Sequence, residues 1–412
     1  MNDARRWYRI ALADLLVAAV IGCILRTIYI VEIPHLTFKP LLHAHSHTAL
    51  LGWIFIGLMV FLLDDEPDER TRRRRKALLW TAQGAVIGML LSFSVQGYGP
   101  VSISMSALHM LTSYLLVREA WVATRPWSPV GSRSLARIAL IGFILSTLGI
   151  WAIGPLLATG QFGTEIYYWS IQFFLHFQFN GWAWFAALAL WGRWAELQGA
   201  PTPLDRFTVR LWVVGTVLSF ALAIAWSERF WYIIAVNSVA VLLQLWAGWR
   251  TGIALRRTQV QLMGQAQLWA WRCVTYALVV MGLKVVMQAA VAIPPVAIMA
   301  FTIRNYVIGF IHLNMLGAIT LMLFAMALLR GWFVSTSTRV RIGLSLFTSG
   351  MVLTEALLFL QGTLFWIGWG MMPGYHGLLL GASILLPLGV AILILFPLGR
   401  GRSRRLVLER RR

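Results

Sequence analysis

Twelve apolar segments, each about the length needed to cross a lipid bilayer, constrain this chain more than any other feature. A bilayer core takes about 20 apolar residues per helix. Of the 412 residues, 59% are hydrophobic and only 12% are charged, whereas a soluble domain of this length needs far more polar surface. The segments are residues 11–31, 43–63, 77–96, 100–121, 135–159, 166–192, 208–226, 229–249, 267–292, 301–329, 341–361 and 375–398. The sequence therefore predicts an all-α, polytopic membrane protein of about twelve transmembrane helices.

Twelve spans leave almost no residues for a soluble domain. We expect a single transmembrane helical domain over residues 1–400 and a basic cytoplasmic tail over 401–412. The first apolar segment is long enough to span and has no small-residue cleavage site, so we interpret it as a transmembrane helix and not as a removable signal. Cys23 and Cys273 form no CxxC or zinc spacing, so neither a disulfide nor a thiolate metal site is predicted.

The distribution of the basic residues explains the formal net charge of +20. Lys and Arg are concentrated at both termini and in every second predicted loop, namely around residues 5–9, 70–76, 118–137, 193–210, 250–257, 330–341 and 402–412. This alternation follows the positive-inside rule. It predicts a multi-pass protein of a bacterial-type cytoplasmic (inner) membrane with both termini cytoplasmic. The bilayer is then the main partner, and nucleic acid is not expected.

Seven of the eight histidines lie in even-numbered predicted helices, which run inward in this topology. At 1.5 Å per residue, the deepest lie about 13–17 Å below the outer surface. Imidazole is the commonest metal-ligating side chain, and ionisable groups within a bilayer usually mark function. A single such histidine could equally form a hydrogen bond between helices, but histidines on five helices at one side favour a heme or metal site. They are His43, His45 and His47 (second helix), His109 (fourth), His176 (sixth), His312 (tenth) and His376 (twelfth).

Four histidines are followed by a glycine five residues later. Three of the helices concerned, the second, sixth and tenth, are themselves four helices apart, which suggests three arcs of four helices around a central site. In an α-helix, a glycine at this spacing is not on the face of the histidine. We expect it to allow close approach of a neighbouring helix or a flat ligand. The pairs are His47 and Gly52, His176 and Gly181, His312 and Gly317, and His376 and Gly381.

The ligand assignment remains open among these histidines. His43 and His47 share a helix face at i and i+4, whereas His45 is expected to point away. We favour His47 and His312 as an axial heme pair, with His43 as the rival of His47 and His45 as a metal ligand only in a supporting or outer-surface position. A second metal would take His176 with either His109 or His376.

Several charged side chains are expected at the same depth. Arg26, Arg304 and Lys284 are candidate partners of heme propionates, although both arginines could instead snorkel to the outer interface. A Lys284–Glu355 pair would satisfy the lysine without any ligand. Glu355 is also a candidate proton carrier, because it is an acid within the bilayer.

The pattern resembles the catalytic subunit I of heme-copper oxidases. By this resemblance, the histidines of the second helix match a low-spin heme ligand. His176 in HFQFN matches a copper ligand, and His312 in HLNMLG matches the first histidine of an H-x-H pair. The chain departs from that pattern at Asn314, where the second histidine would stand, and at Asn180, in place of a tyrosine. It also lacks a histidine pair in 208–226.

The chain is also similar to the NnrS family of heme- and copper-containing membrane proteins. That resemblance lies in HAH at residues 43–45 and in HLNMLGAITLMLFAM at 312–326. Together, the two resemblances imply heme as a cofactor and copper as a second one.

We therefore expect a heme-binding membrane protein, with copper as a candidate second metal, that handles electrons or a diatomic gas such as NO or O2. Its partners would be an electron donor or other respiratory-chain subunits, and whether it turns over a substrate is left open. Two alternatives remain. One is a secondary transporter or metal-ion permease, although the polar groups do not continue into the inner half as such a path requires. The other is a non-catalytic partner of a respiratory complex.

Overall fold

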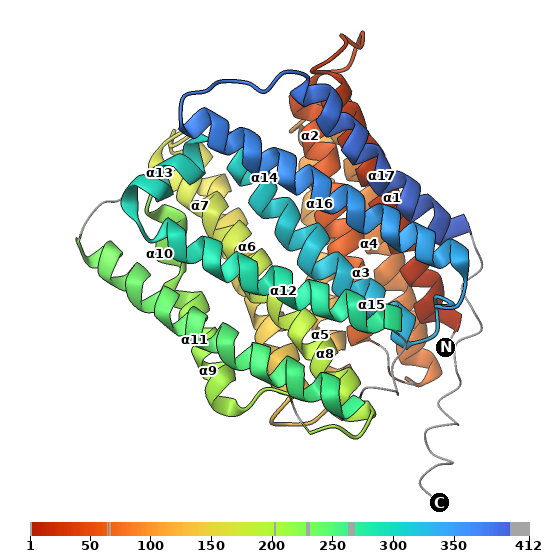
Figure 1. Ribbon diagram of the computed structural model, residues 1–412. Coiled ribbons are helices and arrows are strands. Elements are labelled where there is room, and N and C mark those ends of the chain that lie inside the picture. The colour runs from red at the N-terminus through yellow and green to blue at the C-terminus, as the bar shows by residue number, and fades with distance from the viewer. Residues whose placement is uncertain are drawn as a thin grey trace, which may run out of the picture.

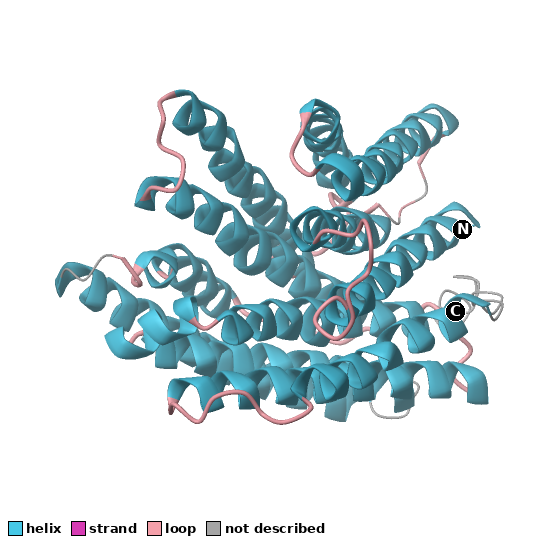
Figure 2. Cartoon of the chain, turned by 90° about the horizontal axis from the view of Figure 1, so that it is seen from above, coloured by secondary structure: helices cyan, strands magenta, loops and turns pink. Residues whose placement is uncertain are grey.

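The chain folds into a bundle of long helices (Figures 1 and 2). The computed structural model describes residues 2–63, 65, 67–201, 203–227, 231–262 and 268–395. These residues contain helices but no strands, and 11 of the helices are long and apolar enough to cross a membrane. The protein is thus an all-α, polytopic membrane protein, as predicted. The predicted basic tail, 401–412, lies outside the described residues.

The helices follow one another as three consecutive groups, which we call the first, second and third arcs. The first arc comprises α1 (Asn2–Thr27), α2 (Phe38–His47), η1 (Thr48–Phe55), α3 (Ile56–Leu62), α4 (Glu69–Gln96) and α5 (Pro100–Ala123). The second comprises α6 (Ser132–Ala158), α7 (Glu165–His176), η2 (Phe177–Ala183), α8 (Trp184–Leu197), α9 (Arg206–Leu218), α10 (Phe220–Ile224) and α11 (Trp231–Leu262). The third comprises α12 (Leu268–Val291), α13 (Pro294–Thr302), α14 (Arg304–His312), η3 (Leu313–Thr320), α15 (Leu321–Leu329), α16 (Thr338–Trp366) and α17 (Tyr375–Leu395).

Each arc is built from four membrane-length segments that pack in the same way. The second segment of each arc consists of a short α-helix, a π-helix (η) and another α-helix in continuous succession. This segment packs against the first one, through α1 with η1, α6 with η2, and α12 with η3. The third and fourth segments pair as α4 with α5, α9 with α11, and α16 with α17. Contacts between α1 and α17 join the last arc to the first, so the three arcs of four form a closed ring.

The predicted segments and the observed helices differ mainly at their ends. Helix α1 begins at Asn2 instead of residue 11, because the basic residues that precede the apolar run continue the helix. The tenth segment, 301–329, is interrupted at Ile303, which lies between the end of α13 and the start of α14. The sixth, 166–192, is helical over α7, η2 and α8 but is not among the 11 candidate spans. Its tyrosine, tryptophan and amide side chains lower its hydropathy.

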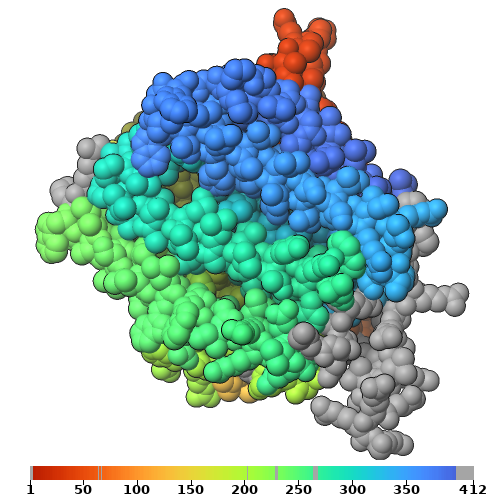
Figure 3. All heavy atoms as spheres, viewed as in Figure 1, coloured from red at the N-terminus to blue at the C-terminus, as the bar shows by residue number. Residues whose placement is uncertain are grey.

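The three second segments meet at the centre, and their two halves differ in burial. In the half that follows the π-helices, α3 has all seven residues buried, and α8 and α15 are buried almost throughout. In the preceding half, α7 and α14 have one buried residue each, His176 and Gly309. We call this half the histidine end; the α1–α2 connection protrudes beyond it (Figure 3). We call the half that contains α3, α8 and α15 the sealed end, because its central segments are buried, whereas those of the histidine end are more accessible.

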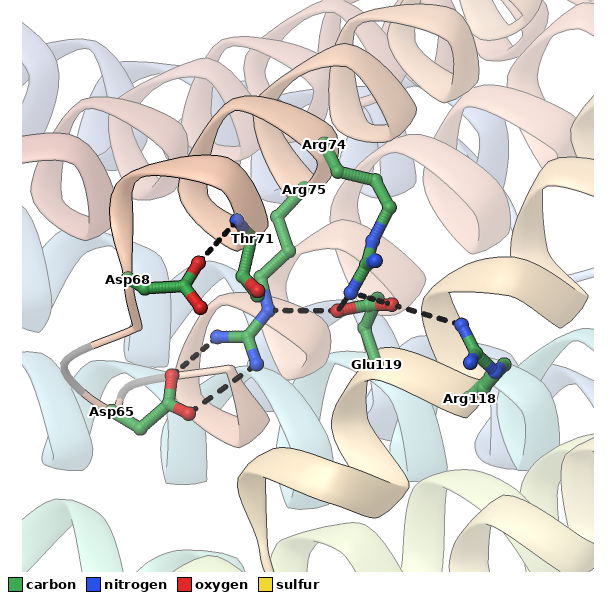
Figure 4. A network of polar contacts seen from close by, with 7 residues as sticks. All are labelled: Asp65, Asp68, Thr71, Arg74, Arg75, Arg118 and Glu119. Atoms are coloured by element: carbon green, nitrogen blue, oxygen red, sulfur yellow. Dashed lines mark hydrogen bonds and ion pairs between the residues drawn. The ribbon is translucent and has the colours of Figure 1, made fainter.

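A cluster of ion pairs fastens α4 to α5 at the sealed end (Figure 4). The Glu119 carboxylate of α5 is 3% exposed and accepts hydrogen bonds from Arg74, at 2.9 Å, and from Arg75, at 3.2 Å. Arg75 also pairs with Asp65. Asp68 caps α4 by accepting a hydrogen bond from the Thr71 amide, which lowers the pKa of the Asp68 carboxyl. The basic run at 70–76 thus also has a local structural role.

Replacement of Glu119 tests the importance of this cluster. Glu119→Gln should lower the free energy of unfolding by about 3 kcal/mol, because it leaves a buried arginine without part of its counter-charge. The matched control is Glu69→Gln, since Glu69 pairs with Arg72 and Arg73 on the same helix but is exposed. The control should leave the unfolding midpoint almost unchanged. Thermal unfolding in detergent measures both, and equal effects would contradict a structural role for the buried cluster.

Candidate functional site

A π-helix begins directly after a histidine in the central segment of each arc. The three π-helices start at Thr48, Phe177 and Leu313, so the residues before them are His47, His176 and His312. Such π-helices are rare and occur frequently at functional sites. Their recurrence at equivalent positions gives the three arcs a common internal feature at the centre of the bundle.

The π-helical register explains the recurring spacing between histidine and glycine. The carbonyl of the residue that precedes a helix accepts the first helical hydrogen bond, and in a π-helix the donor lies five residues on. For His47, His176 and His312, that donor is the amide of the following glycine. The glycine therefore lies one turn beyond the histidine, whereas the sequence analysis assumed an α-helix. The fourth pair differs, because His376 heads a regular α-helix.

The three glycines allow close packing against the first helix of their own arc. A Cβ on Gly52 would lie 2.8 Å from the Asp14 carboxyl group of α1, and one on Gly317 would lie 3.0 Å from Val280 of α12. Gly181 faces Gly142 of α6, and a Cβ on Gly142 would lie 2.8 Å from the Gly181 backbone. The expected close helix approach is confirmed for these three glycines, and the approach is to the same neighbour in each arc. It is wrong for Gly381, where a Cβ would meet nothing within 4 Å.

At the histidine end, His45 of α2 faces His312 of α14. Their ring centroids are 6.5 Å apart, with 75° between the ring planes. The His45 Nδ1–H donates to the Ala18 carbonyl of α1 at 2.8 Å, and Nδ1 of His312 lies 3.9 Å from a Glu355 oxygen. The Nε2 atoms of both rings form no hydrogen bond with any described residue. Two imidazoles with unpaired Nε2 atoms are thus held close together by three different helices.

The surroundings of this pair are polar and incompletely hydrogen-bonded. Nδ1 of His312 and both carboxyl oxygens of Glu355 are buried without a hydrogen-bond partner. The Arg26 side chain of α1 lies near enough to interact electrostatically with His45, His312 and Glu355. The His312 side chain is surrounded by protein, yet 23% of its surface is accessible. These groups therefore have unsatisfied hydrogen-bonding capacity, and part of the His312 side chain is accessible.

His47 does not lie opposite His312. Its Nδ1–H donates to the His43 carbonyl at 2.9 Å, and its ring lies against Phe93, with centroids 4.4 Å apart. His43 and His47 share a helix face, as predicted, with ring centroids 6.5 Å apart. The structure therefore gives the position facing His312 to His45, which the sequence analysis placed on the opposite side. The orientation of α2 about its axis, fixed by the Ala18 contact, determines this difference.

The remaining histidines do not converge on a second metal site. The His176 Nε2–H donates to the Thr216 carbonyl at 2.8 Å, and its Nδ1 accepts from Asn180 at 3.1 Å, so both ring nitrogens are used. His109 lies beside Ser113 and Phe55, and His376 stacks on Tyr29 near the bundle end. Among the described residues, no group of three or more His, Cys, Asp or Glu side chains could hold a metal ion.

The predicted cationic partners lie in different environments. The Lys284 ammonium is 4.3 Å from the centroid of the Trp184 ring, and the side chain is buried. No ion pair joins Lys284 to Glu355, so the predicted alternative pairing is not formed. The Arg304 guanidinium stacks over Phe38 at 4.9 Å, at the start of α14. Of the three cations, Arg26 is the one placed beside both His45 and His312.

The sequence analysis missed a buried acid near the middle of α1. Asp14 is 7% exposed and accepts a hydrogen bond from the Gln83 amide of α4 at 2.9 Å. A carboxyl group in the middle of an otherwise apolar segment is the signal that could have identified it.

Comparison with known proteins adds no further constraint on the function. No protein-family model matches the chain, and no curated protein matches it.

Two glycines of α6 provide a matched test of the close packing. Gly142→Ala should lower the free energy of unfolding by about 1–3 kcal/mol, because the new Cβ would overlap the Gly181 backbone and force α6 away from η2. Gly154→Ala is the control, since a Cβ there meets nothing within 4 Å. The control should be neutral or slightly stabilising in thermal unfolding. A neutral Gly142→Ala would contradict tight packing at this contact.

Proposed function

We propose that this chain is a heme-binding membrane protein in which His45 and His312 are the two axial ligands. The observation that carries the proposal is the pair of facing imidazoles whose Nε2 atoms have no protein partner. Metal–imidazole bonds are about 2 Å long, which puts the centroids of two rings on opposite sides of one metal ion roughly 6 Å apart. The 6.5 Å between the His45 and His312 centroids agrees with this spacing.

The hydrogen bonds of the two rings also suit metal ligation. Ligating histidines usually donate the other ring N–H to a carbonyl or carboxylate, which fixes the tautomer and the orientation of the ring. The Ala18 carbonyl does this for His45. Glu355 stands in the corresponding place for His312, although at 3.9 Å the contact is longer than a hydrogen bond. With the proton on Nδ1, the lone pair of each ring is on Nε2, the atom that would bind the metal.

The remaining features of the site fit a large anionic cofactor. At the histidine end, α7 and α14 have one buried residue each, whereas α8 and α15 at the sealed end are buried almost throughout. Arg26 supplies a positive charge beside the two histidines, where it would pair with a propionate. Gly22 lets α1 lie close to His45, because a Cβ there would be 3.2 Å from the ring.

A heme held by two histidines supplies one-electron transfer, and an open or displaceable ligand position permits binding of a gas such as NO or O2. The protein would contribute the two imidazoles, the charge of Arg26 and the exclusion of water. In the proposed orientation, both termini are cytoplasmic in a bacterial inner membrane, so this site lies in the outer half. An electron donor or respiratory-chain partner would approach from that side. Copper binding remains a prediction from the sequence, because His176, His109 and His376 do not converge on one site.

Substitution of single histidines distinguishes the two ligand assignments. His45→Ala and His312→Ala should each abolish the bis-imidazole absorption spectrum of the purified, dithionite-reduced protein, because each removes an axial ligand. His47→Ala and His43→Ala are matched controls from the same helix and should retain the spectrum. Loss in His47→Ala with retention in His45→Ala would favour the assignment from sequence instead. A wild-type protein without a Soret band, produced in a heme-sufficient host, would refute heme binding. Copper analysis of the same samples would test the second cofactor.

A further inference from the structure

Asp14 and Gln83 form a buried pair near the middle of the membrane-spanning helices α1 and α4. The Gln83 amide nitrogen donates to one carboxyl oxygen of Asp14, Oδ1, at 2.9 Å. The two side chains are only 7% and 4% exposed. This site is separate from the proposed heme ligands, and nothing in the proposed function requires it.

The other two polar atoms of this pair have no hydrogen-bond partner in the part of the chain that the structure describes. They are Oδ2 of Asp14 and Oε1 of Gln83, and both are buried. Each oxygen can accept a hydrogen bond but cannot donate one, so they cannot satisfy one another as they stand. An unsatisfied buried polar group typically costs about 1–3 kcal/mol, and more if it is charged. The pair therefore lacks one donor.

We propose that Asp14 is a proton-binding site and carries a proton on Oδ2 that is donated to Oε1 of Gln83. A carboxylic acid and a primary amide then form two antiparallel hydrogen bonds, one in each direction. A single proton satisfies both unpartnered atoms and removes the negative charge. The O–H bond forms at Oδ2, and no other bond changes.

The charge environment favours a proton over an ionised carboxylate. Among the described residues, no charged side chain faces Asp14, and its hydrogen-bond partner is Gln83. The basic residues of α4 lie near its start, at 70–76, and the titratable residues of α17 lie near its outer end. The nearest histidine of the η1 segment, His47, directs its ring toward Phe93 and its Nδ1 toward the His43 carbonyl. An isolated carboxylate in an apolar interior would be strongly disfavoured.

A metal cation fits the pair less well than a proton does. Oxygen-ligated cations such as calcium and magnesium take about six or more ligands, whereas this site offers one carboxyl and one amide oxygen. Gly52 packs directly against this carboxyl group, since a Cβ there would lie 2.8 Å from Oδ2 of Asp14. A proton needs only one acceptor, and Gln83 supplies it.

Infrared spectroscopy of the full-length protein in detergent tests the protonation directly. At pH 7, the difference spectrum between wild type and Asp14→Asn should contain the carbonyl band of a protonated carboxylic acid, and this band should shift in D2O. Asp3→Asn, an exposed position on the same helix, is the control and should show loss of an ionised carboxylate instead. If the Asp14→Asn difference shows loss of an ionised carboxylate, the proposal is wrong. This readout does not depend on heme.

Thermal stability provides a second test that separates protonation from simple packing. Asn at position 14 can donate to Oε1 and accept from Nε2 of Gln83, so Asp14→Asn should keep the wild-type unfolding midpoint. Asp14→Leu should lower it, because both polar groups of Gln83 lose their partner. If Asp14→Asn is as unstable as Asp14→Leu, the acid is needed as a charge. If sodium or potassium raises the midpoint of wild type but not of Asp14→Asn, a cation occupies the site; either result overturns the proposal.

Discussion

The backbone hydrogen bond between each central histidine and the glycine five residues later organises the middle of this protein. In α-helical register, the glycine would turn away from the histidine; in π-helical register, its amide pairs with the histidine carbonyl. The glycine can then lie against the first helix of the same arc, as Gly181 does against Gly142. The central segments are thereby held close to their partners at the depth where the histidine end meets the sealed end. The three arcs can therefore pack tightly at α3, α8 and α15, the inner parts of their central segments, and still leave α2, α7 and α14 more accessible.

This division concentrates the polar groups where the packing is looser. Imidazole and carboxyl groups are costly to bury unless they find partners. At the histidine end, Nδ1 of His312 and both carboxyl oxygens of Glu355 have no hydrogen-bond partner among the described residues. By contrast, the buried acid Glu119 at the sealed end is paired, because it contacts three arginines. Unpaired groups of this kind are what the proposed heme site would require. Paired charges at the opposite end are those of a structural clamp.

The apolar segments and the spacing of the histidines predicted the helices, the three arcs and the central position of residues 47, 176 and 312. They could not predict which side of α2 faces α14. The sequence analysis assumed a regular α-helix and placed His45 outside; the contact with the Ala18 carbonyl turns its ring toward α14 instead. That contact joins residues 27 positions apart and leaves no periodic signal in the sequence. For Asp14, an acid within an apolar segment is visible in the sequence, but its pairing with Gln83, 69 residues away, is not.

Helix α1 connects the two proposed sites. Asp14 precedes Ala18 by four residues, so the two lie one turn apart on the same face. The Ala18 carbonyl orients His45, and the Asp14 carboxyl fills the space that Gly52 leaves beside η1. Loss of the proton from Asp14 would place a negative charge about one helical turn from the residue that positions a proposed ligand. Conversely, an electron added near His45 would raise the local negative charge and favour retention of that proton. The two sites would therefore be linked through electrostatics and through the position of a single helix, without any group passing between them.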